Sequence, residues 1–368
     1  MAGVYIAYPF CSQKCSFCNF ASGVHPKEME ERYLAALRTE MESHRWEWTP
    51  ETVYIGGGTP GRLEAKQLRV LLEATPGRPW REATLEAAPG GITHEAARGW
   101  REAGINRVSL GVQSFAAAEL RWTGRRHTAE VVAQEAAVLR QEGISNFNID
   151  LIAGLPGQTE AGWRRSLEWV ARLEAPHVSV YMLEVDEDSR LGREILGGGS
   201  RYGAPEAPSE ELTVEMYEMA VEELRRAGLE RYEISNFARR GYESLHNLKY
   251  WKLEPYVGFG VDAHSFDGRV RRENTAEAAE YVARMESGQS PCAAERAASP
   301  EEERFFVGLR LREGVRLGDG EAGRLPPGVG QHIQEGFLEL DGGVLRLTPK
   351  GILFSNEVLQ EFLNHERA

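Results

Sequence analysis

The run Cys11-Ser12-Gln13-Lys14-Cys15-Ser16-Phe17-Cys18 places three cysteines directly after the first strand-like segment of the chain. Closed zinc sites and fully ligated four-iron clusters normally take four protein ligands, so three thiolates leave one metal position open. A four-iron cluster held in this way can bind a small chelating molecule at its free iron, such as the methionyl end of S-adenosylmethionine (SAM). We therefore predict that Cys11, Cys15 and Cys18 hold a reactive [4Fe-4S] cluster.

Other roles for these cysteines remain open from the residues alone. A zinc site would need a fourth ligand from Cys292, the only other cysteine, or from a histidine. A disulfide would leave an odd thiol, and a chain of 368 residues needs no cross-link to hold its core. Cys292 itself is expected to be a small buried apolar residue.

The composition describes an acidic, globular chain with 42% hydrophobic residues and a net charge of -13. This charge opposes binding to nucleic acid, which needs clustered Lys and Arg. No apolar run approaches the ~20 residues that span a bilayer, and residues 1–10 lack the features of a signal peptide. We expect a protein of the reducing cytoplasm, with at most a peripheral contact to a membrane.

Strand-like runs alternate with amphipathic helical stretches over the first half of the chain. The predicted strands are Val4–Tyr8, Thr52–Ile55, Ala83–Glu86, Arg107–Val112, Asn146–Ile152 and His177–Leu183. The predicted helices are Glu28–His44, Ala65–Ala74, Thr93–Ala103, Ala129–Glu142 and Glu160–Leu173. Repeated strand–helix units indicate a parallel α/β sheet. Six units, rather than the eight of a closed barrel, predict an incomplete, laterally open (β/α)6 barrel with its ligands at the strand C-terminal ends.

The second half is expected to finish this barrel and to add a small domain. A helix is predicted at 210–227, a turn-rich segment at 232–267 and a polar linker at 287–299. The predicted domains are therefore 1–290 and 295–368. The tail is expected to contain helices at 301–310 and 329–335, a hairpin at 338–347 and a last helix at 350–363. This order is typical of a mostly helical, winged-helix-like domain, and its acidic composition favours a packing or lid role over DNA binding.

Polar side chains end the predicted strands or begin the loops after them. SAM joins a zwitterionic amino acid to a ribose and an adenine, so its site needs partners for a carboxylate, an ammonium group and two hydroxyls. Arg125 can bind the carboxylate and Glu86 the ammonium group, while Gln113 and Asp150 can bind the ribose. Each of these residues could instead be a cap, a surface charge or part of a rim salt bridge.

Backbone groups and aromatic rings complete this predicted site. Gly57, Gly58 and Thr59 follow the second strand, where glycines let bare backbone groups approach a ligand. A tight turn into the next helix is the plain alternative. Tyr5 and Phe17 flank the cysteines and could shield or stack on the cofactor, although core packing would explain either ring equally well.

Several motifs occur together in the chain. They are Tyr5, Pro9–Cys18, Gly56–Pro60, Leu85–Ala87, Gly111–Ser114 and Asn148–Pro156. In this order they resemble the radical SAM proteins of the oxygen-independent coproporphyrinogen III oxidase-like group. The resemblance implies that an electron enters the cluster from a donor, and that SAM is cleaved to methionine and a 5'-deoxyadenosyl radical.

This group contains oxidases, which decarboxylate propionate side chains of coproporphyrinogen III, and the similar HemW-type heme chaperones, which do not. The oxidases carry a further cysteine two residues after the third, where this chain has Phe20. They also carry an extension before the first strand, which begins here at about Val4. The resemblance therefore favours a heme chaperone over an active oxidase, which stays the alternative.

The segment His246-Asn247-Leu248-Lys249-Tyr250-Trp251 resembles the heme-binding motif of the chaperones. Imidazole can ligate heme iron, and the two aromatic rings could cover a porphyrin. His246 is therefore the expected heme contact. A turn with buried aromatics, and with the histidine bonded to backbone, is the alternative. The resemblance further implies that heme passes to membrane hemoproteins such as respiratory-chain components.

Two further residues, His264 and Glu184, could also belong to this site. His264 follows a glycine-rich turn and could face the cofactor, but packing explains it as well. Glu184 follows the sixth strand and could touch the cofactor, although an exposed acidic loop is simpler. Neither is assigned a role, and no residue is assigned as catalytic.

Overall fold

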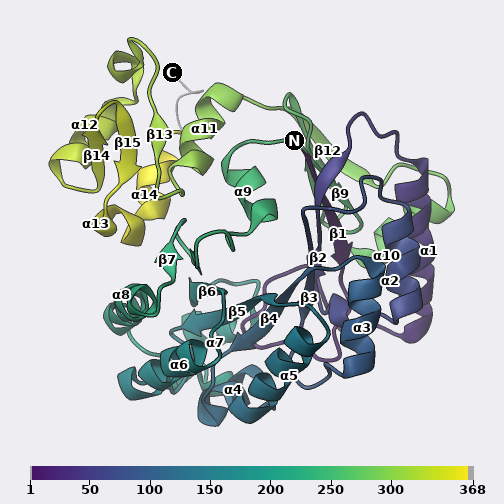
Figure 1. Cartoon of the computed structure of the whole chain (residues 1–368). Coiled ribbons are helices and arrows are strands. Elements are labelled where there is room, and N and C mark those ends of the chain that lie inside the picture. The colour runs from purple at the N-terminus through teal and green to yellow at the C-terminus, as the bar shows by residue number, and fades with distance from the viewer. Residues whose placement is uncertain (1, 364–368) are drawn as a thin grey trace.

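Six parallel strands form the centre of the fold in the computed structural model, which describes residues 2–363 (Figure 1). They are β1 (Ala2–Tyr8), β2 (Pro50–Gly57), β3 (Glu82–Ala87), β4 (Arg107–Gln113), β5 (Asn146–Ala153) and β6 (His177–Met182). Each strand pairs in parallel with the next. Within the described residues β1 and β6 do not pair with each other, so the barrel stays open. The predicted incomplete (β/α)6 barrel is confirmed.

Helices cover the outer face of this sheet (Figure 1). The long ones are α1 (Lys27–Ser43), α2 (Ala65–Glu73), α3 (His94–Ala103), α5 (Ala129–Gln141), α6 (Glu160–Arg172) and α8 (Glu210–Arg226). Short helices lie in the connections that follow β2, β4 and β6, and they are η1 (Pro60–Arg62), α4 (Ala117–Thr123), α7 (Arg190–Leu196) and η2 (Arg201–Glu206). Three of the long helices have a threonine N-cap, whose hydroxyl accepts a hydrogen bond from a backbone N–H of the first turn. The caps are Thr93 for α3, Thr128 for α5 and Thr159 for α6.

The segment predicted as turn-rich is more ordered than expected. It contains β8 (Asn236–Ala238), α9 (Leu245–Trp251), β9 (Tyr256–Phe259) and β10 (His264–Phe266), and β7 (Glu230–Arg231) precedes it. β9 pairs in parallel with β1, while β8 pairs antiparallel with β6, so the sheet extends past both ends of the barrel. The prediction was wrong because strands this short carry too little alternation to be distinguished from turns.

The predicted linker at 287–299 is also partly a strand. After β11 (Val270–Asn274) and α10 (Ala278–Glu286), β12 (Cys292–Ala297) pairs antiparallel with β11 at the edge of the sheet. β12 is an exposed edge strand of mostly small residues, so its sequence carries no clear apolar alternation and looked like a linker. Cys292 is only partly buried, so the expected core position was wrong. We propose that the boundary lies at residue 300, since an earlier one would separate two paired strands.

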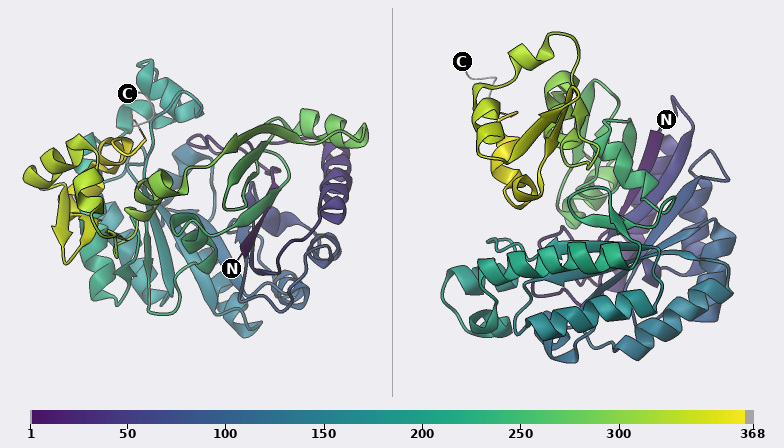
Figure 2. Two further views of the ribbon diagram at one scale, coloured as in Figure 1. Left: turned by 90° about the horizontal axis from the view of Figure 1, so that it is seen from above. Right: turned by 60° about the vertical axis from the view of Figure 1, so that its left-hand side comes forward.

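The C-terminal unit has a winged-helix-like order of elements. It comprises α11 (Pro300–Gly308), β13 (Val315–Arg316), η3 (Glu321–Arg324), α12 (Pro327–Gln334), β14 (Leu338–Asp341), β15 (Val344–Leu347), α13 (Pro349–Leu353) and α14 (Ser355–Gln360). The predicted last helix is broken at Phe354, and β13 was not predicted. Residues 364–368 lie outside the described residues. In Figure 2 this unit, green to yellow, lies next to α9.

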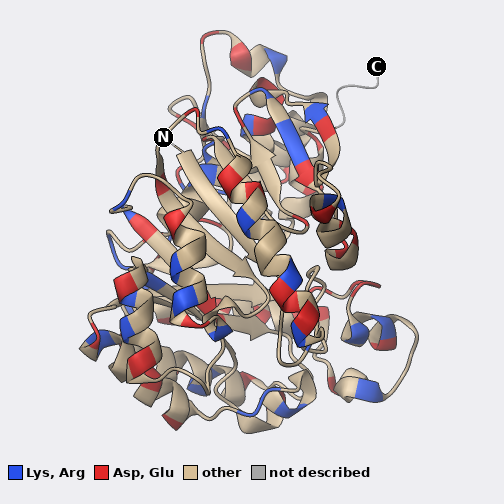
Figure 3. Ribbon diagram, turned by 90° about the vertical axis from the view of Figure 1, so that its right-hand side faces the viewer, with Lys and Arg blue, Asp and Glu red and all other residues tan. Residues whose placement is uncertain are grey.

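Two separate hydrophobic clusters support these two units. The large one lies between the sheet and its helices and includes the fully buried Trp163 and the nearly buried Trp100. The small one joins Phe305, Leu345 and Val358 within the C-terminal unit. Figure 3 shows basic and acidic residues interspersed along the outer helices. Among residues 2–363, no helix has both the length and the apolar character to cross a bilayer.

Candidate cofactor site

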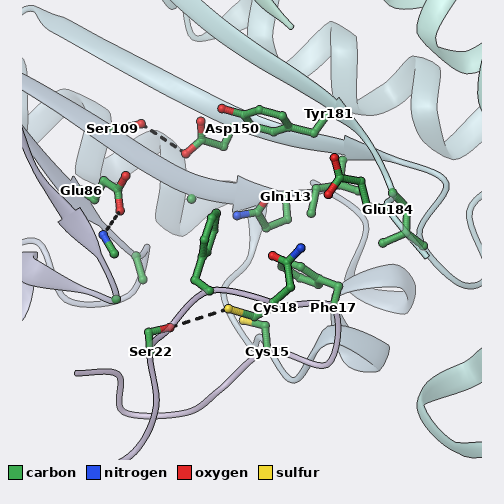
Figure 4. A pocket seen from close by; sticks show the side chains of 18 of the residues that line it. Cys15, Phe17, Cys18, Ser22, Glu86, Ser109, Gln113, Asp150, Tyr181 and Glu184 are labelled. Atoms are coloured by element: carbon green, nitrogen blue, oxygen red, sulfur yellow. Dashed lines mark hydrogen bonds between the residues drawn. The ribbon is translucent and has the colours of Figure 1, made fainter. Parts of the chain in front are cut away.

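A cavity of about 450 Å³ lies at the C-terminal ends of the barrel strands (Figure 4). The three cysteines line it together with eight of the predicted SAM contacts, which are Phe17, Gly57, Gly58, Thr59, Glu86, Gln113, Arg125 and Asp150. Parallel strands bring their C-terminal ends to one edge, so residues far apart in sequence meet there. Tyr5 and His246 are the two predicted contacts that do not line the cavity.

The loop that carries the cysteines is held by backbone contacts to distant segments. The Cys11 N–H donates to the Gly23 carbonyl at 2.8 Å, and the Ser16 hydroxyl donates to the Trp122 carbonyl at 2.9 Å. The Ser16 carbonyl in turn accepts from the Leu191 N–H at 2.8 Å. These contacts fix the loop without using the thiols.

All three thiols are free and only partly buried. The Thr59 hydroxyl donates to Cys11 Sγ at 3.7 Å, and Cys18 Sγ lies 3.8 Å from the Ser22 hydroxyl (Figure 4). Burial raises the pKa of the Cys11 thiol, an effect that a bound metal reverses because it stabilises the thiolate. Three soft sulfur donors facing one cavity fit an iron–sulfur cluster, and Cys292 is absent from the cavity wall.

The end of β2 is packed against the start of the cysteine loop. The Gly58 N–H donates to the Tyr8 carbonyl at 2.8 Å, and a Cβ on Gly58 would lie 2.7 Å from that same oxygen. Gly57 has a φ of 104°, which favours glycine. Only glycines therefore allow this approach, and they leave the cavity wall formed by backbone.

Glu86 lies beside this glycine turn. One carboxylate oxygen accepts from the Tyr54 hydroxyl at 2.8 Å and the other from the Gly57 N–H at 3.2 Å. Burial raises the pKa of Glu86 to about 7, and the nearby Asp150 carboxylate adds to this effect. A ligand ammonium group would offset both effects, so the site fits a cationic partner for Glu86.

Replacing this carboxyl should have opposite effects on stability and on SAM binding. The folded-state pKa of about 7 lies above the ordinary 4.5, so the stability contributed by protonation is full below pH 4.5 and is lost as the pH rises through 7. Glu86→Gln avoids that loss. As the pH rises from 5 to 8, we expect the free energy of unfolding of Glu86→Gln to rise relative to that of the wild type by up to about 3 kcal/mol. We also expect the variant to bind SAM more weakly. Denaturant unfolding at both pH values and SAM titration measure this, and equal pH profiles would contradict it.

Asp150 and Gln113 approach the cavity from neighbouring strands. Asp150 accepts from the Ser109 hydroxyl at 3.2 Å and from the Asn148 side-chain amide at 2.6 Å, and burial raises the pKa of Asp150 (Figure 4). Gln113 has a φ of 70°, at an irregularity in the pairing of β4 with β5. Such irregularities turn a side chain out of the regular alternation, which here directs Gln113 toward the cavity.

Arg125 has an unused donor at the cavity. One terminal nitrogen donates to the Gly111 carbonyl at 2.6 Å, but Nε is buried and has no hydrogen-bond partner among the described residues. A buried unpaired donor on a cationic group is costly, and a ligand carboxylate would satisfy it. The donor set of the cavity therefore fits both charged ends of an amino acid.

Tyr5 lies one layer behind the cavity. Its ring stacks on Tyr54, with ring centroids 6.1 Å apart, and Tyr54 rather than Tyr5 lines the wall. Tyr5 is therefore not on the cavity wall, and its contact with the cofactor stays a prediction. It lies behind the wall because the side-chain alternation of β1 packs this ring against the neighbouring strand.

His246 lies in α9 and is only 1% exposed. Its Nδ1 is 2.9 Å from the Thr52 hydroxyl and its Nε2 is 2.8 Å from the Tyr250 hydroxyl. Burial lowers the pKa of His246 to about 3, so the ring is neutral. Because both ring nitrogens have protein partners, neither is available to iron in this conformation. The alternative of a bond to backbone also differs from the structure, since both partners are side chains.

The structure adds residues that the sequence interpretation missed. Tyr181, Met182 and Leu183 line the cavity at the end of β6, and Glu184 lies on the same wall. Their position after a barrel strand was a usable signal. Arg310, Ser355 and Asn356 reach the cavity from the C-terminal unit, which no local pattern indicated. His264 is exposed on β10 beside Asp262 and Glu273, and does not line the cavity.

Comparison with known proteins agrees with this architecture. A family model described as the radical SAM superfamily matches residues 5–170, and one described as the HemN C-terminal domain matches residues 301–354. Heme chaperone HemW of Bacillus subtilis is 32% identical over 381 residues, covering 99% of both chains. The HemW proteins of Lactococcus lactis and Escherichia coli are 33% and 30% identical, covering 98% of this chain and 96% and 97% of their own.

The solved structure of Escherichia coli coproporphyrinogen III oxidase (HemN), a radical SAM enzyme, superposes with a TM-score of 0.85. It covers 99% of this chain and 90% of its own at 22% identity, which shows a shared fold and no more. An open (β/α)6 barrel with a three-cysteine loop after β1 defines a radical SAM protein. Within that class, the chain belongs to the HemW family, because its similarity to HemW proteins extends over its whole length.

Proposed function

We propose that this protein is a radical SAM heme chaperone, which binds a [4Fe-4S] cluster, SAM and heme and delivers the heme to membrane hemoproteins. The observation that carries this proposal is the full-length similarity to HemW proteins at 32% identity. Phe20, where the oxidases have a cysteine, is 66% exposed and lies on the cavity wall. It therefore offers the cavity no fourth thiolate.

Within this proposal Cys11, Cys15 and Cys18 hold the cluster. Arg125 binds the SAM carboxylate, Glu86 the ammonium group, and Gln113 and Asp150 the ribose. The Gly57 and Gly58 backbone, Thr59 and Phe17 complete the contact, while Tyr5 acts from behind through Tyr54. When bound, the cluster and SAM supply reductive radical chemistry, and the walls around them exclude water.

The proposed recipients of heme are respiratory-chain proteins, and an electron donor would reduce the cluster. We propose a cytoplasmic location, where thiols stay reduced. Titration of the full chain with heme, with and without a reconstituted cluster, tests the central claim. Saturable binding of about one heme per chain supports the proposal, and no binding in either form contradicts it.

An oxidase activity is the competing function, since the HemN fold is shared. Anaerobic incubation of the cluster-loaded protein with coproporphyrinogen III, SAM and a reductant separates the two. We expect no vinyl-bearing product by mass analysis. Formation of that product at catalytic yield would replace the chaperone with an oxidase.

His246 stays the proposed heme ligand, and α9 would have to move before a ring nitrogen could reach iron. We expect His246→Ala to weaken heme binding about tenfold or more and to change the visible spectrum of the bound heme. His264→Ala, which alters an exposed histidine outside the cavity, is the matched control. An unchanged spectrum and affinity in His246→Ala would leave His246 a buried structural residue.

A further inference from the structure

The cavity has a second part beyond the proposed cluster and SAM contacts. Its barrel side is formed by the end of β6 and by the start of the segment that follows β7, where Met182, Leu183 and Ile234 are apolar and Glu184 and Ser235 are polar. In Figure 4 Tyr181, from the same strand end, lies across the pocket from Cys15 and Cys18. The C-terminal unit contributes Arg310, next to Leu311, which bridges to Glu233. One cation thus lies at the edge of a partly apolar surface.

Arg310 is held in place by its surroundings. The next residue, Leu311, forms a bridge with Glu233, and the Arg312 N–H donates to the Tyr232 carbonyl at 2.9 Å. The Arg310 guanidinium lies over the Trp251 ring, with its central carbon 4.7 Å from the ring centroid. Stacking of this kind orients the planar group and leaves its edge donors available.

Among the described residues Arg310 has no hydrogen-bonding partner for its charge, although it lies close enough to the Glu233 carboxylate to oppose the rise in the pKa of Glu233 that burial causes. The Arg310 Nε is buried, and the guanidinium takes part in no hydrogen bond or ion pair within residues 2–363. The neighbouring Glu233 carboxylate is engaged by the Ser235 N–H at 2.9 Å and by the Asn236 amide at 2.5 Å. The other cations of the cavity wall, Lys14 and Arg125, each donate to a backbone carbonyl. Arg310 is therefore poised for an anion from a ligand.

We propose that Arg310 binds a carboxylate of the porphyrin ligand, a heme propionate, while the macrocycle lies against Met182, Leu183 and Ile234. This inference rests on the proposed function. Arginine presents paired donors that match a carboxylate, and an apolar wall with one placed charge suits an amphipathic ring. Because Arg310 belongs to the C-terminal unit and the apolar wall to the barrel, the bound heme joins the two.

The test compares ferric heme with ferric heme dimethyl ester, in which both carboxylates are blocked. Both are titrated into the full chain with its cluster reconstituted. We expect Arg310→Gln to lower the affinity for heme about tenfold and to leave the affinity for the ester unchanged. Arg310→Lys, which keeps the charge, should retain part of the affinity. Arg312→Gln is the matched control, because Arg312 is exposed and pairs with Glu230.

The outcomes separate this inference from the proposed function. Wild-type protein that binds neither porphyrin contradicts the chaperone function itself. Wild-type binding that Arg310→Gln leaves unchanged, or weakens equally for heme and ester, overturns only the propionate contact. SAM binding is measured in parallel, since SAM also carries a carboxylate. A loss of SAM affinity with unchanged heme affinity would overturn the heme assignment of Arg310.

Discussion

Cys15→Ala is expected to prevent assembly of the [4Fe-4S] cluster and to abolish reductive cleavage of SAM. The three thiols line one cavity, and no other cysteine does, so the loss of one leaves too few protein ligands. Iron and sulfide per chain, and the paramagnetic resonance signal of the reduced cluster, should fall to background after reconstitution. Heme titration of the same variant shows whether the binding of heme requires the cluster.

The control for this prediction is Cys292→Ala. Cys292 lies on the edge strand β12 and is absent from the cavity wall, so its removal should leave iron content and the signal of the cluster unchanged. A Cys15→Ala protein that retains a full four-iron cluster would contradict the three-thiolate assignment. Loss of the cluster in Cys292→Ala would make Cys292 a fourth ligand, which requires a different arrangement of the chain.

The second large effect is expected at Glu82, which anchors the start of α9 to β3. Its carboxylate accepts from the Leu245 and His246 N–H groups, both at 2.9 Å, and from the Ser244 hydroxyl at 3.3 Å. Glu82 is 2% exposed. Glu82→Ala leaves these buried donors without a partner, so we expect a loss of about 3 kcal/mol or more in the free energy of unfolding.

Denaturant unfolding followed by circular dichroism measures this loss. Glu218→Ala, an exposed position in the middle of α8, is the control and should change the stability by less than about 0.5 kcal/mol. A similarly small change in Glu82→Ala would mean that water replaces the carboxylate and that α9 is held by its packing alone. The result also bears on His246, since α9 must move before that ring can bind iron.

Much of the barrel was predictable because its signals are local and long. β4 and β5 alternate apolar residues with polar or small ones over most of their length, and α3 and α6 carry both an amphipathic pattern and a threonine cap. The position of the cavity was predictable from the order of the strands. Parallel strands align their C-terminal ends, so residues in the C-terminal halves of different strands, such as Glu86 in β3 and Asp150 in β5, were expected to meet, and both line one cavity.

Local pattern failed where long-range pairing decides the structure. β9 has four residues, and it is a strand because it pairs with β1, more than two hundred residues earlier. β12 is short and exposed, and it is a strand because it pairs with the edge of β11. In both strands the hydrogen bonds are made with another strand, and the local sequence of the segment does not predict that pairing.

The amino-acid sequence by itself predicted the open barrel, the three cysteines of the cavity and eight of its other lining residues, because each depends on local periodicity or on the order of the strands. Only the tertiary structure decided the environments of His246 and Arg310. His246 is enclosed by side chains from β2 and α9, while Arg310 reaches the cavity from a separate unit. The burial of His246 and the lack of a hydrogen-bonding partner for Arg310 among the described residues depend on which distant surfaces meet, and these surfaces meet only when the chain is packed.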